Sequence, residues 1–213
     1  MATSRENILS KLRAAQSSVP GYPPVEQHLP MVPVVDSSLD ALIERFRSQA
    51  QRLAGIVHEA ASDAQAVETI LSILGHDTSV LSWAFDYIPL AGLEEALRAR
   101  GIAIAEVRDP SVRVGITGVD AALAATGSLM LSAKMGKHRV TSLLPPVHIA
   151  VVRREQVVAD FETWIARQRA QGGDAFREPS GSIMISGPSR TADIAMQVQM
   201  GMHGPAELHI ILV

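Results

Sequence analysis

The chain has 213 residues, of which 47% are hydrophobic, and 19 Lys and Arg side chains stand against 22 Asp and Glu, for a formal net charge of −3. This length and apolar content suffice to bury a full core, whereas the slightly negative charge disfavours a nucleic-acid duplex or an anionic membrane surface as a partner. The chain contains no cysteine, which excludes disulfides, thiolate nucleophiles and cysteine-bound iron–sulfur clusters. Redox chemistry would need a partner or a bound group, and we predict no cofactor in this chain.

The sequence carries no recognisable export or membrane signal. The first seven residues lack the apolar region of a signal peptide, and no later segment has the roughly 20 uninterrupted apolar residues of a membrane span. We therefore expect a cytoplasmic protein without a membrane span.

Residues 1–36 have the features of a helical arm followed by a linker. Thr3 and Glu6 have the spacing of a capping box, and the apolar side chains that follow recur on one face, which predicts a short amphipathic helix over residues 4–16. Five prolines between residues 20 and 33 exclude a helix or a central strand there and predict an extended linker. The arm could pack on its own domain or on a neighbouring subunit of a homo-oligomer, and both alternatives stay open here.

From residue 37 onward, helix and strand patterns alternate. Apolar residues recur at helical spacing after Ser38, after Ser62 and around Leu93. Strand patterns occur at residues 55–59, 79–85, 102–107, 112–116, 128–132, 147–152, 182–185 and 208–213. We therefore predict one α/β domain over residues 37–213, built on a mostly parallel open sheet with helices on both faces.

The strongest site candidate follows the apolar run 183–185, where residues 186–194 have the pattern of a tight turn and a helix start. Gly187 permits a close backbone approach, and Ser189 or Thr191 can cap the helix. Together with the positive charge of Arg190, these groups predict an anion-binding site at a strand–turn–helix junction, outside the carboxyl ends of the strands. The alternative is that the hydroxyls only cap the helix and the arginine pairs with a surface carboxylate.

A second glycine-containing segment, residues 115–129, predicts a strand, a short helix, a turn and another strand. Five of its residues could line an anion or carbonyl pocket through hydroxyls and exposed amides: Thr117, Gly118, Thr126, Gly127 and Ser128. The segment matches neither a dinucleotide-binding fingerprint nor a Walker loop. Close helix packing is the alternative explanation for its small residues.

Histidines are the candidates for proton transfer. His148 alternates with apolar neighbours in a predicted strand, where a structural role is the default and proton transfer requires that its face opens to a cleft. His203 precedes the last strand, and the nearby His209 invites a metal site, but no ligand-spacing pattern accompanies them and we predict no metal. The polar loop that carries His138 and Arg139 could attract an acidic ligand or remain solvated.

Several segments resemble, in this order, signatures of the LUD-domain family, whose best-studied members are of the lactate-utilisation protein C type. These segments are GITG at 115–118, TGSL at 126–129, SLLPPVHI at 142–149, GPSRTADI at 187–194 and GMHGPAELH at 201–209. The resemblance covers about half of the chain, and residues 1–110 agree only in layout. It implies a fold like that of ribose-phosphate isomerase, glucosamine-phosphate deaminase and the CoA transferases, in agreement with the α/β prediction.

The resemblance also implies a function. Lactate-utilisation proteins act as a set of three that oxidises L-lactate to pyruvate, and the other two members carry iron–sulfur ligands, so the cysteine-free chain fits the non-redox member. Its partners would be those iron–sulfur proteins and an anionic small molecule. The family commonly has a glutamate where this chain has Ala125, which can neither bind a proton nor attack a carbonyl, so ligand binding is expected rather than acyl transfer. The alternative is a free-standing enzyme of the same superfamily that acts on a phosphate or CoA substrate, with His148 or His203 as the acid–base group.

Overall fold

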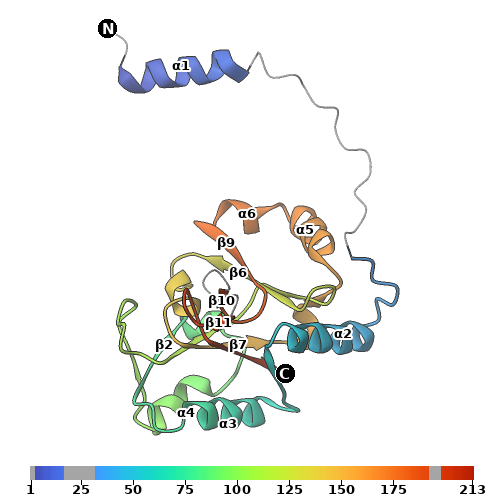
Figure 1. The fold of residues 1–213 in the computed structure, drawn as a ribbon, viewed down its shortest axis with the longest axis vertical. Coiled ribbons are helices and arrows are strands. Elements are labelled where there is room, and N and C mark those ends of the chain that lie inside the picture. The colour runs from blue at the N-terminus through green and yellow to red at the C-terminus, as the bar shows by residue number, and fades with distance from the viewer. Residues whose placement is uncertain (1–2, 17–31, 192–197) are drawn as a thin grey trace. The chain divides into compact units, whose positions relative to one another are not determined.

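The computed structural model describes residues 3–16, 32–191 and 198–213, and it divides into two units, residues 1–31 and 32–213 (Figure 1). In the first unit, α1 (Ser4–Gln16) confirms the predicted helix. It begins with the predicted capping box, because the Thr3 amide donates to Glu6 Oε2 at 2.6 Å and the Glu6 amide donates to Thr3 Oγ1 at 3.3 Å. Most of the predicted linker, residues 17–31, lies outside the described residues. The domain boundary after residue 36 stays a prediction.

The first three α-helices of the second unit begin where the sequence predicts. The α-helices are α2 (Leu39–Arg52), α3 (Asp63–Leu74), α4 (Leu93–Ala99), α5 (Phe161–Ala170) and α6 (Asp174–Arg177), and the 3-10 helices are η1 (Phe85–Tyr87), η2 (Arg139–Ser142) and η3 (Arg154–Gln156). Ser62 caps α3, since its Oγ accepts the Gln65 amide at 3.3 Å, and Gly75 ends this helix with a φ of 58°. Within the described ranges, none of the helices has the length and apolar character needed to cross a membrane.

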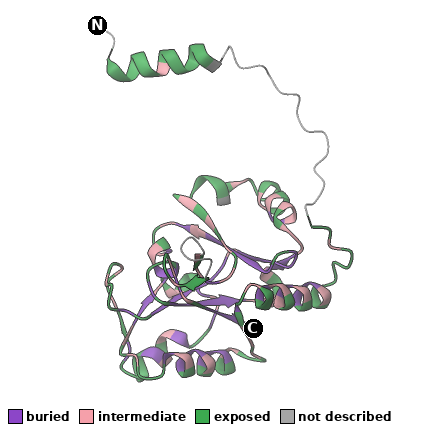
Figure 2. Cartoon of the chain, in the orientation of Figure 1, coloured by how far each residue is buried: buried purple, intermediate pink, exposed green. Residues whose placement is uncertain are grey.

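A six-stranded sheet forms the centre of the second unit. Its strands, in spatial order, are β1 (Ile56–Glu59), β12 (Glu207–Leu212), β7 (Val147–Val152), β4 (Val114–Thr117), β2 (Ser79–Ser82) and β3 (Ala103–Ile104). Every neighbouring pair in this sheet is parallel, which confirms the α/β class and the mostly parallel sheet. Figure 1 shows α3 and α4 side by side along one face of this sheet, and Figure 2 shows that the central strands are buried.

A second sheet, absent from the sequence prediction, joins β8 (Val157–Val158), β5 (Ala121–Leu123), β6 (Ser128–Ala133) and β9 (Gly181–Ile185) in that order. The predicted short helix after residue 120 is wrong, because β5 occupies this position. Ala122 belongs to the main core, whereas Ala121 and Leu123 face a smaller cluster with Trp164. Successive side chains of β5 are thus buried on opposite faces, as in a strand. This tertiary environment overrides the helix preference of alanine.

Two turns of the second sheet pack on the end of α2. A Cβ placed on Gly127, whose φ is 70°, would lie 2.3 Å from the backbone nitrogen of Ala50. A Cβ placed on Gly187, whose φ is 85°, would lie 2.3 Å from the carbonyl oxygen of Leu53. A side chain fits at neither position, so these glycines allow the turns to approach the helix backbone. For Gly127, the close approach to α2 supports the alternative that this small residue serves close helix packing and does not line a pocket.

We expect Gly127→Ala to lower the free energy of unfolding by about 3 kcal/mol or more, because it combines a left-handed backbone with overpacking against α2. Gly101→Ala is the matched control: the φ of Gly101 is 69°, but nothing lies within 4 Å of an added Cβ, so only the backbone cost remains. That cost is about 1 kcal/mol. Urea unfolding measures both losses, and equal losses would contradict the packing explanation.

Candidate functional site

Residues 186–191 form a turn and a short strand. Arg190–Thr191 is β10, which pairs antiparallel with β11 (Gln199–Met200). A helix that begins directly after a cap at Ser189 is therefore wrong, because Arg190 and Thr191 are extended and pair with residues 199–200. The predicted helical positions 192–194 lie outside the described residues. Arg190 has an exposed side chain and Thr191 is half-buried, and anion binding by these two residues stays a prediction.

The polar groups of Ser189 already have partners within the chain. Its amide donates to the Pro205 carbonyl at 2.8 Å, and its Oγ accepts the His203 amide at 3.2 Å. Pro205 stands just before β12, and Gly187 lies against Leu53, just before β1. The turn therefore lies at the amino ends of parallel strands and not at the predicted carboxyl ends. The reason is that β9, which leads into the turn, belongs to the second sheet and not to the parallel one.

Three hydroxyls join the two predicted site segments. Thr126 Oγ1 donates to Ser128 Oγ at 2.9 Å, and Ser128 Oγ lies 2.7 Å from Ser186 Oγ. The structure thus brings Thr126, Gly127 and Ser128 beside the turn at Gly187, with the last turn of α2 packed on both glycines. A helix carboxyl end carries partial negative charge, which disfavours an anion at this place.

Thr117 and Gly118, at the carboxyl end of β4, have other neighbours. A Cβ on Gly118 would lie 2.2 Å from the carbonyl oxygen of Tyr87, so this glycine also serves close packing. Thr117 is fully buried, and its Oγ1 lies 2.8 Å from His148 Nε2. The sequence-predicted site residues therefore do not form one site. Thr117 and Gly118 contact His148 and Tyr87, whereas Thr126, Gly127 and Ser128 lie beside the turn at Gly187.

His148 lies inside the parallel sheet, on β7, and is only 1% exposed. Its Nδ1 is buried without a hydrogen-bond partner. Burial lowers the pKa of His148 from 6.5 to about 3, so the ring is neutral near pH 7. Proton transfer would require an open face, and this burial supports the structural alternative.

Burial of a neutral His148 makes stability depend on pH. In the unfolded chain a histidine takes up a proton near pH 6.5, whereas the folded ring stays neutral down to about pH 3. The free energy of unfolding should therefore fall as the pH drops below 6.5, by up to about 1.4 kcal/mol per pH unit from this residue. Urea unfolding at a series of pH values measures the slope, and His148→Gln is the control. An unchanged slope in His148→Gln would contradict the assignment.

The other candidate histidines lie near the amino ends of the strands. His203 is exposed. His209 stacks on His58 with ring centroids 5.3 Å apart, its Nδ1 lies 3.0 Å from His58 Nε2, and its Nε2 lies 3.1 Å from Glu207 Oε2. Burial and the neighbouring ring lower the pKa of His58, a residue that sequence reasoning missed because it is 151 positions away from His209. Among the described residues, no group of three or more His, Cys, Asp or Glu is placed to hold a metal ion.

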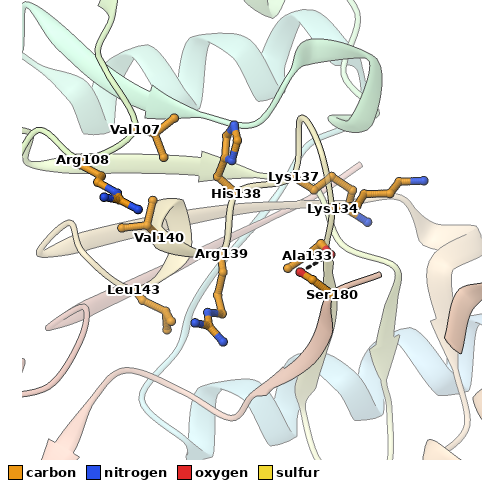
Figure 3. Close-up of a pocket in the computed structure, with 10 residues that line it drawn as sticks. All are labelled: Val107, Arg108, Ala133, Lys134, Lys137, His138, Arg139, Val140, Leu143 and Ser180. Carbon is orange, nitrogen blue, oxygen red and sulfur yellow. Dashed lines mark hydrogen bonds between the residues drawn. The ribbon is translucent and has the colours of Figure 1, made fainter. Parts of the chain in front are cut away.

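A cavity of about 690 Å³, which we call the basic cavity, is bordered by the connection after β3, the loop after β6 and η2 (Figure 3). Its basic lining residues are Arg108, Lys134, Lys137, His138 and Arg139, and its apolar ones include Val107, Val140 and Leu143. No acidic residue lines it within the described part of the chain. Sequence reasoning found the charged loop at His138 and Arg139 and missed Arg108, which comes from another connection.

Lys137 is only 5% exposed, and its ammonium group has partners within the chain. Nζ forms an ion pair with Asp120, donates to Ser132 Oγ at 2.8 Å and lies 4.6 Å from the centre of the Trp83 ring. These contacts fix the position of the ammonium group, so Lys137 serves the structure and is not a free nucleophile. With Lys134 it also lines a second cavity of about 370 Å³ near Asp120.

We expect Lys137→Met to lower the free energy of unfolding by about 3 kcal/mol, because it leaves the carboxylate of Asp120 without its buried partner. Lys134→Met is the matched control: the Lys134 side chain is 33% exposed and pairs at 3.6 Å with Glu178, which is 62% exposed. Loss of such a surface pair costs less than about 1 kcal/mol. Thermal unfolding compares the two variants, and equally small effects would contradict the structural role of Lys137.

Comparisons with a family model and with known proteins agree on one family. A family model described as LUD domain matches residues 43–213. Lactate utilization protein C of Macrococcus caseolyticus is 37% identical over 120 residues, which cover 56% of this chain and 50% of the relative. The protein of the same name from an Exiguobacterium species is 30% identical over 179 residues, which cover 84% of this chain and 67% of the relative. The match to the Macrococcus relative thus spans only about half of its length.

A crystal structure is similar in fold. It is that of a DUF162 family protein from Deinococcus radiodurans, with a TM-score of 0.61 and 21% identity, and the alignment covers 85% of this chain and 99% of that one. At this identity the likeness supports the fold alone. Because the family model matches most of the sequence, from residue 43 within α2 to residue 213, the chain belongs to the LUD domain family.

Proposed function

We propose that this protein acts in lactate utilisation, as a component that carries no redox group of its own. The observation that carries the proposal is the similarity to relatives named lactate utilization protein C, one of which aligns over 84% of this chain. The absence of cysteine supports the non-redox part, because the chain cannot supply thiolate ligands to an iron–sulfur cluster. The electrons of lactate would then pass to partners, which we propose to be iron–sulfur proteins in the cytoplasm.

Binding rather than covalent catalysis is the role that the described residues favour. Ala125 is buried, and its amide donates to the Ala159 carbonyl at 2.8 Å, so this position holds a backbone contact in the core and offers no reactive side chain. His148 is buried inside the sheet, so its ring is not accessible for proton transfer to a ligand. An anionic ligand remains part of the proposal, with the exposed Arg190 as one candidate partner for its charge.

Deletion of the gene in the organism that carries it tests the proposal. We expect growth on L-lactate as sole carbon source to be lost and growth on pyruvate to be kept, because pyruvate lies after the proposed oxidation. The wild-type gene supplied on a plasmid should restore growth on L-lactate.

Association is the second measurement. The tagged protein should co-purify with iron–sulfur proteins from lactate-grown cells, with pyruvate-grown cells as the control. In the growth experiment, normal growth of the deletion strain on L-lactate would contradict the proposed role in lactate utilisation. Turnover of a phosphate or CoA substrate by the purified chain alone would favour the free-standing enzyme instead.

A further inference from the structure

We propose that the basic cavity binds a small organic anion with two or more negative charges, of the phosphate-ester class. This site differs from the turn at residues 186–191, and it does not depend on a role in lactate utilisation. The cavity is lined by five basic side chains and by no acidic one among the described residues. Such a concentration of one sign of charge is unexpected for a chain whose formal net charge is −3.

The basic residues of the cavity differ in whether their charge is already balanced. Lys137 pairs with Asp120, and Lys134 pairs with Glu178. By contrast, the ion pairs of the described residues include neither Arg108 nor Arg139. Two guanidinium groups therefore border the same cavity without a protein carboxylate, and their charge is available to a ligand.

The charge of the site selects the ligand class. A guanidinium group presents a planar set of donors that matches carboxylate or phosphate oxygens in pairs. A single carboxylate, such as that of lactate, can satisfy one such group and leaves the other unmatched. A phosphoryl group carries about two charges near neutral pH and three acceptor oxygens, so its charge matches the two unpaired guanidinium groups of Arg108 and Arg139.

The shape of the site indicates an organic anion and not a bare ion. Val107, Val140 and Leu143 line the cavity together with the two arginines, and Figure 3 shows these side chains in the left part of the view, with Lys134 to the right. A volume of about 690 Å³ lies within the usual range for small-molecule sites and exceeds what a bare phosphate fills. The apolar side chains can contact the carbon part of the ligand while the guanidinium groups bind its phosphoryl group.

Isothermal titration with three probes tests the charge and the apolar contact separately. Phenyl phosphate and benzoate share a ring and differ in charge, and inorganic phosphate lacks the ring. At low salt near pH 7.5 we expect phenyl phosphate to bind at least 10-fold more tightly than either of the other two, and to weaken as salt is added. Equal affinity for benzoate and phenyl phosphate, or no binding of phenyl phosphate at millimolar concentration, would overturn the proposal.

Arginine variants locate the binding. Arg139→Gln and Arg108→Gln should each weaken phenyl phosphate binding at least 10-fold, with thermal unfolding as the check on folding. Arg98→Gln, on the exposed surface of α4 where its side chain is 72% exposed, is the control and should bind as the wild type does. Binding that survives in the Arg108→Gln, Arg139→Gln double variant, or that is lost only in Arg190→Ala, would place the anion elsewhere and refute the assignment to the basic cavity. The lactate growth phenotype bears on the proposed function and not on this result.

Discussion

The arrangement of the second unit depends on contact between the last turn of α2 and two glycine turns. α2 contacts β1 of the parallel sheet and β8 of the second sheet, so it lies where the two sheets meet. At this place the backbone around Ala50 and Leu53 meets Gly127 and Gly187 with no side chain between them. Because protein interiors are close-packed, a single methyl group there would force the turn and the end of α2 apart. The turns that resemble a ligand-binding loop are thus held by packing.

The parts of the fold that the sequence predicts are those with long, regular apolar patterns. β7 has the predicted bounds, 147–152, because it is an apolar run, interrupted only by His148, that is buried throughout. β5 is three residues long and rich in alanine, and β10 has two residues, so neither is long enough to show a strand period. Their strand character comes from pairing, of β5 with β6 and β8 and of β10 with β11, and segments this short carry no pattern that reveals it.

The candidate site was harder to predict than the fold for a related reason. Glycine next to hydroxyl residues indicates that something approaches the backbone, but it does not say whether a ligand or the chain itself does so. At Gly118 and Gly187 it is the chain, through the carbonyl groups of Tyr87 and Leu53. The basic cavity also needs the approach of Arg108 to the loop after β6, and nothing in the sequence marks that approach.

Pairing separates the polar groups that support the fold from those that are available to a ligand. Ser189 and Lys137 both have partners inside the chain, and replacing those partners by a ligand would leave buried groups unsatisfied. Arg108 and Arg139 have no ion pair among the described residues, so binding an anion there breaks no ion pair of the protein. A net charge near zero does not conflict with such a site, because the field at a cavity depends on the nearest charges and on how they are balanced. The balance of charge around each group therefore separates the polar residues that hold the fold from those that can take up a ligand, which the kind of residue alone does not do.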